Sequence, residues 1–94
     1  MSYTVLIEKR AFNFLEGLSE KSQRIIRDKC KMLVEDPFPG HFGDKELLHL
    51  DHKLYRLHLG RSYTVFYQIL EDEKVVKILE ITTIEQAHKK YRRL

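Results

Sequence analysis

The segment Leu54–Ile69 alternates apolar and polar residues on both sides of a single glycine, Gly60, in the sequence LYRLHLGRSYTVFYQI. Alternation with a period of two is typical of β-strands, and a glycine between two such runs is typical of a tight hairpin turn. The segment therefore predicts two antiparallel strands. This hairpin constrains the fold most, because the rest of a short chain must pair with it or pack against it.

The two faces of the predicted hairpin differ in chemistry. One face carries apolar and aromatic side chains from both strands: Tyr55, Leu57, Leu59, Tyr63, Val65 and Tyr67. On the other face, the first strand carries Arg56 and His58, which the strand repeat separates by about 7 Å. The second strand adds Thr64, Phe66 and Gln68 to that face. We expect the apolar face to pack on the core and the other face to be the functional surface.

Before the hairpin, the sequence predicts a strand and two helices. Residues 3–7 are β-branched or aromatic for the most part, which favours a strand. Apolar residues recur at helical spacing within Lys9–Glu35, with Gly17 at the end of a first helix and Ser19 as the N-cap of a second. These two helices are expected to share one apolar side.

After the second helix, residues 37–44 contain two prolines and two glycines and predict a loop. Residues 46–50 form a short apolar run, which is either a strand or the approach to one. The acidic turn 71–74 follows the hairpin, and residues 75–82 predict a central strand. Helical spacing within 84–94 predicts a short terminal helix or tail. The predicted order is β-α-α-β-β-β, an α+β fold with two helices on a twisted antiparallel sheet, which the first strand joins beside a later one.

Composition narrows the class of protein. The chain has 94 residues, which we interpret as one domain, 1–94, and a formal net charge of +3, which favours an anionic partner. No segment resembles a signal peptide or a membrane span, so we expect a cytoplasmic protein with no membrane partner. The single cysteine, Cys30, is expected in the core. His49 and His52 lack supporting ligands and no cofactor motif is present, so we expect neither a metal nor a cofactor.

The polar face and the basic tail together suggest phosphodiester chemistry. RNA can be cut without a metal when its 2′-hydroxyl attacks the adjacent phosphate, provided that the protein stabilises the phosphorane and protonates the leaving oxygen. Arg56 and His58 share one face, and Arg61 lies in the turn beside them. A tail that folds across this face would add His88, Lys89, Lys90 and Tyr91. From spacing alone, a solvated outer face and a solubilising basic tail explain the same residues equally well.

Leu54–Ile69 also resembles the core signature of the RelE/ParE superfamily of toxins from prokaryotic type II toxin–antitoxin pairs. The shared pattern is an aromatic and a basic residue, an apolar/basic alternation, a glycine turn and Tyr-x-Val-x-Tyr. For the RelE branch, the resemblance implies ribosome-dependent cleavage of mRNA in the A site. It also implies neutralisation by an antitoxin that wraps extended and helical segments around the toxin. Arg56 and His58 match the two basic strand positions of the family, and Tyr91 matches its C-terminal tyrosine.

The sequence departs from the RelE pattern at two places. Thr64 stands where arginine usually follows the first tyrosine of the second strand, and Glu85, Gln86 and Ala87 fill an interval where another arginine is expected. Tyr63–Tyr67 also resembles the ParE branch, which inhibits DNA gyrase and needs no RNA-cleaving residues. Three hypotheses follow: an mRNA endoribonuclease, which we prefer, a gyrase inhibitor, and a degenerate homologue that only binds antitoxin.

The preferred hypothesis assigns two sets of site residues. The expected catalytic residues are Arg56, His58, His88 and Tyr91. The residues expected to bind RNA or the ribosome are Lys53, Arg61, Lys89, Lys90, Arg92 and Arg93. The expected partners are a cognate antitoxin, mRNA and the ribosome, with DNA gyrase as the alternative target.

Overall fold

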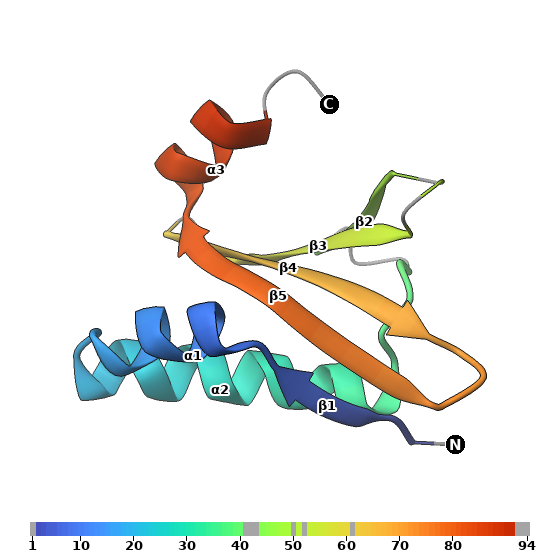
Figure 1. Ribbon diagram of the computed structural model, residues 1–94. Coiled ribbons are helices and arrows are strands. Elements are labelled where there is room, and N and C mark those ends of the chain that lie inside the picture. Colours follow the sequence, from blue (N-terminus) through green and yellow to red (C-terminus); the bar gives the residue numbers. More distant parts are fainter. Residues whose placement is uncertain (1, 41–43, 50, 52, 61, 92–94) are drawn as a thin grey trace.

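The computed structural model describes residues 2–40, 44–49, 51, 53–60 and 62–91, and only the backbone of residues 49 and 88–91. Its helices and strands follow the predicted order (Figure 1). They are β1 (Thr4–Ile7), α1 (Lys9–Glu16), α2 (Glu20–Glu35), β2 (Lys45–His49), β3 (Leu54–Leu59), β4 (Tyr63–Leu70), β5 (Val75–Thr83) and α3 (Ile84–Tyr91). The sequence left the run at 46–50 open; its described residues belong to the strand β2, so four strands follow the two helices.

The five strands form one sheet in the order β1-β5-β4-β3-β2. The strands from β2 to β5 pair antiparallel with their neighbours, as predicted, and Gly60 adopts a φ of +61° in the β3–β4 turn. The first strand joins the sheet beside the last one, and β1 runs parallel to β5. The sheet is therefore mixed rather than wholly antiparallel.

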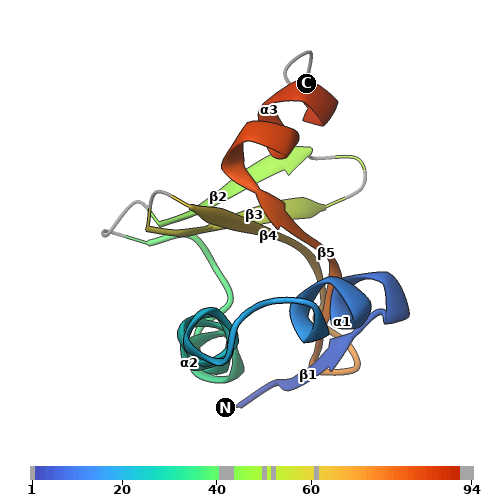
Figure 2. The ribbon, with the colours of Figure 1, turned by 90° about the vertical axis from the view of Figure 1, so that its left-hand side faces the viewer.

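The sheet has helices on both of its sides. In Figures 1 and 2, α1 and α2 lie on one side, and α3 lies on the other, above the end of β5. The predicted apolar face of the hairpin packs against α1 and α2. The buried residues of this core are Ala11, Leu15, Ile26, Leu33, Leu57, Leu59, Val65, Tyr67, Ile69, Val76, Ile78 and Ile81. No helix in the described part of the chain is long and apolar enough to cross a membrane.

The turn between α1 and α2 forms as the sequence predicts. The Ser19 hydroxyl accepts a hydrogen bond from the backbone N–H of Ser22 at 3.2 Å, which satisfies one of the free N–H groups at the start of α2. The Gln23 amide donates to the carbonyl of Leu18 at 3.0 Å. Gly17 follows α1 directly and donates its N–H back to the last turn of that helix. These bonds fix the angle at which α2 enters the core.

Tyr67 ties the loop after α2 to the sheet. Its side chain is fully buried, its ring stacks on Tyr55 with centroids 5.4 Å apart, and its hydroxyl donates to the carbonyl of Pro37 at 2.7 Å. Burial raises the pKa of Tyr67, so the phenol keeps the proton that it donates. Phe38 packs edge-on against the Tyr3 ring as a second anchor of this loop.

We predict that Tyr67→Phe lowers the free energy of unfolding by about 1–2 kcal/mol, because the buried Pro37 carbonyl loses its donor while the ring is retained. Urea denaturation followed by circular dichroism measures the loss. Tyr55→Phe is the matched control, since it removes a phenolic hydroxyl from the stacked, more exposed ring and should cost less. Equal losses for the two variants would contradict the assigned role of the Tyr67 hydroxyl.

Candidate functional site

The face of the sheet opposite the main core is only partly open. Thr64 and Phe66 of β4 belong to this face, yet they are 1% and 0% exposed, and Ala87 of α3 is also buried. The helix α3 packs against β4 and β5 on this side (Figure 1). We had expected a solvent-facing surface along both strands of the hairpin. Polar side chains of β3 and β2, toward the edge of the sheet, remain accessible on this face.

Arg56, His58 and Glu46 form one cluster at this edge. The antiparallel register of β2 and β3 places Glu46 directly opposite Arg56, and the Arg56 guanidinium donates a hydrogen bond to Oε1 of Glu46. The same carboxylate oxygen lies 3.6 Å from Nε2 of His58. Strand β3 thus brings Arg56 and His58 together as the sequence predicted, and β2 adds a carboxylate that sequence reasoning missed.

The three side chains of this Glu46–Arg56–His58 cluster are half-buried. The exposed fractions of the side chains are 22% for Arg56, 37% for His58 and 43% for Glu46, so a ligand can reach all three. The Nε of Arg56 is buried and has no hydrogen-bond partner among the described residues. The guanidinium is therefore held by Glu46 on one side and has donor capacity left over.

Among the side chains that the structure describes, charges of both signs occur on this face of the sheet. Along one row across the sheet, the register gives Glu46, Arg56, Phe66 and Glu80, with one cation between two carboxylates. In the next row, His58 is opposite Thr64, which is in turn opposite Thr82. Thr64 donates its hydroxyl hydrogen bond to the Leu57 carbonyl at 3.3 Å. The position where an arginine is expected in the RelE pattern is thus filled by a buried, internally bonded threonine.

Other predicted site residues lie at different places. Lys53 precedes β3 with a φ of 49° and lines a hollow with the acidic turn residues Glu71, Asp72 and Glu73, at the end of β3 away from His58. The backbone of residues 88–91 belongs to α3, which lies on the side of the sheet away from α1 and α2 (Figure 2). Arg56 and His58 belong to that side too, because they alternate with Leu57 and Leu59 of the main core. The side chains of His88, Lys89, Lys90 and Tyr91, and all of Arg61, Arg92 and Arg93, lie outside the described residues.

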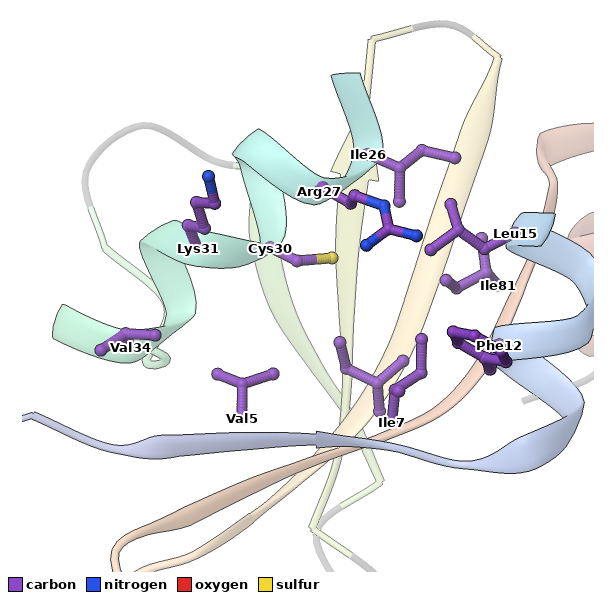
Figure 3. Close-up of a pocket in the computed structure, with 11 residues that line it drawn as sticks. Val5, Ile7, Phe12, Leu15, Ile26, Arg27, Cys30, Lys31, Val34 and Ile81 are labelled. Atoms are coloured by element: carbon purple, nitrogen blue, oxygen red, sulfur yellow. The ribbon is translucent and has the colours of Figure 1, made fainter. Parts of the chain in front are cut away.

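An apolar cavity of about 280 Å³ lies on the opposite side of the sheet, between β1, α1 and α2 (Figure 3). Its walls include Val5, Ile7 and Phe12, and the Cys30 thiol points into it. Burial raises the pKa of Cys30 to about 12, so this thiol is protonated at neutral pH and is a poor nucleophile. The Arg27 guanidinium reaches over the cavity from α2.

The described part of the chain contains no candidate metal site. No group of three or more His, Cys, Asp or Glu side chains lies close enough together there to hold an ion. The imidazoles of His49 and His52, which the sequence analysis considered as ligands, fall outside that part.

Comparisons with known proteins give consistent results. A family model described as ParE toxin of type II toxin–antitoxin systems, parDE, matches residues 5–87. A comparison with curated protein sequences gave no match. Among solved structures, the chain is similar to the toxin in a RelE–RelB complex from the archaeon Pyrococcus horikoshii, with 32% identity, a TM-score of 0.75, and coverage of 88% of this chain and 96% of that one.

Two further solved structures share the fold at lower identity. A free RelE variant from E. coli is 21% identical with a TM-score of 0.75 and full coverage of both chains. A YoeB/ParE toxin from Agrobacterium tumefaciens is 13% identical, with a TM-score of 0.70 and coverage of 85% of this chain and 96% of that one. Because the family model spans most of the sequence and the archaeal toxin exceeds 30% identity, this chain belongs to the RelE/ParE family of type II toxin–antitoxin system toxins.

Proposed function

We propose that this chain is a metal-independent endoribonuclease that cuts mRNA on the ribosome. The observation that carries the proposal is the Glu46–Arg56–His58 cluster, in which a base, a permanent cation and a proton-transferring imidazole meet on one accessible sheet edge. Cleavage through the RNA's own 2′-hydroxyl needs these three chemical functions and no metal. Translating mRNA would place this activity in the cytoplasm.

In the proposed reaction, the carboxylate of Glu46 accepts the proton of the 2′-hydroxyl as its oxygen bonds to phosphorus. The P–O5′ bond breaks, His58 donates a proton to the leaving 5′-oxygen, and the products are a 2′,3′-cyclic phosphate and a 5′-hydroxyl. Arg56 stabilises the negative charge of the phosphorane. In the free toxin, the Glu46 carboxylate accepts a hydrogen bond from the Arg56 guanidinium. An incoming phosphate competes for the same guanidinium, which releases the carboxylate to act as a base.

The tail completes this site in our proposal. The position of α3 on the side of Arg56 and His58 supports a contribution from His88 and Tyr91 to proton transfer. The cationic residues expected to hold RNA or the ribosome are Lys53, Arg61, Lys89, Lys90, Arg92 and Arg93. They would supply the positive charge that the balanced row of the sheet lacks.

We predict that Arg56→Ala and Glu46→Gln each slow mRNA cleavage by about 100-fold or more, since each removes a group that acts on the transition state. Primer extension on translating ribosomes measures the rate under single-turnover conditions. Glu8→Gln is the matched control, because Glu8 is 42% exposed and pairs with Lys77 at 3.1 Å, as Glu46 pairs with Arg56. Cleavage that survives both cluster substitutions at the control rate would overturn the site.

Inhibition of DNA gyrase is the second candidate function. The burial of Thr64 favours it, because the position expected to hold an arginine for RNA cleavage in the RelE branch has no accessible side chain here. The match to a ParE family model points in the same direction. A supercoiling assay with purified gyrase separates the two candidates. Loss of supercoiling without ribosome-dependent mRNA cleavage would replace the endoribonuclease proposal with this one. If the chain showed neither effect, the remaining hypothesis would be a degenerate homologue that only binds antitoxin.

We also propose a cognate antitoxin as partner. Several structurally similar proteins were solved as toxin–antitoxin complexes. On this chain, the apolar cavity beside the edge strand β1 offers a surface for an extended apolar segment, with Phe12 39% exposed and Leu6 51% exposed. An antitoxin bound there would leave the Glu46–Arg56–His58 cluster uncovered unless a second segment reached it.

We predict that Phe12→Ala weakens antitoxin binding at least about tenfold, because it removes an exposed aromatic wall of the cavity. Isothermal titration with the cognate antitoxin measures the affinity. Leu70→Ala, which truncates a similarly exposed apolar side chain at the far end of β4, serves as the control and should bind normally. Unchanged affinity of the Phe12 variant would exclude this cavity as the antitoxin surface.

A further inference from the structure

Helix α2 exposes two large apolar side chains that the core does not use. Ile25 is 52% exposed and Met32 is 53% exposed, although both belong to an amphipathic helix whose Ile26 and Leu33 are fully buried. Seven residues separate Ile25 from Met32, so they lie two turns apart on the same side of the helix. With Asp28 and Lys29 between them, they define a surface that we call the α2 stripe.

The α2 stripe borders a shallow groove of about 400 Å³. The groove runs between the stripe and the start of the β3–β4 turn, where Leu59 and Gly60 form the other wall. In Figure 2, which shows α2 nearly end-on, α1 and β1 lie on one side of α2, and no described helix or strand covers its other side. Two exposed apolar residues beside a groove are typical of a contact surface.

The charges of the stripe determine which partner fits. A twofold axis through the middle of α2, between positions 28 and 29, would pair two copies of the helix antiparallel. Ile25 of one copy would then face Met32 of the other, and Asp28 would face Lys29. One step further out, the exposed Lys21 would approach Asp36, an exposed residue that follows the end of α2 and whose carboxylate also accepts a hydrogen bond from the Phe38 N–H at 3.2 Å. Each apolar residue thus meets an apolar residue, and each charge meets its opposite.

We propose that a second copy of this chain binds the α2 stripe and forms an isologous dimer through antiparallel α2 helices. Self-complementarity is the condition that twofold symmetry imposes on an interface, and the order apolar–acid–base–apolar along the stripe meets it. The antiparallel arrangement also pairs the helix dipoles favourably. The proposed dimer does not depend on the catalytic proposal, since the α2 stripe does not include the Glu46–Arg56–His58 cluster.

The ion pairs within one chain are compatible with this dimer. Lys29 contacts Asp44 at 3.2 Å, and its ammonium group has further donors for a carboxylate of the second copy. Asp28 pairs with Lys31 at 3.7 Å, but both side chains are more than half exposed, so this pair is weak and exchangeable. The interface is built on one helix from each copy, and we therefore expect reversible association rather than a permanent dimer.

Sedimentation velocity of the purified full chain tests the proposal between about 1 and 200 µM, a range that suits a modest interface. The chain should shift from monomer to dimer with rising concentration. Asp28→Lys and Lys29→Asp should each weaken the dimer at least about tenfold, because each replaces two attractive pairs with two repulsive ones. Arg10→Asp, at an exposed position of α1 outside the α2 stripe, is the control for a change of charge and should dimerise normally.

Mixing the two charge variants gives the sharpest readout. The Asp28→Lys variant has two positive charges at the centre of the stripe, and the Lys29→Asp variant has two negative charges there. The two variants are therefore complementary, and their mixture should dimerise when neither variant does alone. This rescue also shows that both variants are folded. A wild-type chain that stays monomeric throughout the range, or a mixture that stays monomeric while wild type dimerises, would overturn the proposal and leave the stripe to a different protein.

Discussion

Burial of β4 on both of its faces is the constraint on which the rest of this structure depends. Val65 and Tyr67 point into the main core, while Thr64 and Phe66 are buried on the other side. A strand buried on both faces needs a layer above and a layer below it. The pair α1 and α2 supplies one layer, and α3 packs on the other side of the sheet.

This constraint also determines where chemistry can occur. Although α3 packs against β4 and β5, it leaves polar side chains of β3 and β2 accessible on that side of the sheet. Glu46, Arg56 and His58 lie there, half-buried, with the Glu46 carboxylate in contact with both of the other side chains. Partial burial strengthens electrostatic interactions while leaving a path for a ligand. The β2–β3 edge is thus a place on this sheet where a phosphate could be held by fixed charges.

Much of the fold could be predicted from local patterns. The alternation on both sides of Gly60 identified the β3–β4 hairpin, and Ser19 marked the start of α2, because hairpin turns and helix caps are decided by a few neighbouring residues. The parallel pairing of β1 with β5 could not be read in this way, since it joins residues about 70 positions apart and leaves no periodic signal.

The site was harder to predict than the fold. Arg56 and His58 were found because they alternate on one strand. Glu46 was missed because its place opposite Arg56 depends on the register between β2 and β3, which the sequence of either strand alone does not contain. Thr64 and Phe66 were expected on an open surface, because alternation identifies two faces of a strand but cannot tell that a distant helix covers the second one.

The claim that Glu46 and His58 act as one unit with Arg56 has a direct test in a double-mutant cycle. The cleavage rate on translating ribosomes is measured for Glu46→Ala, for His58→Ala and for the double variant. If Glu46 as the base and His58 as the acid act in one concerted step, the double variant should lose little more activity than the slower single variant. Losses that multiply would show that the residues act separately and would contradict a common site.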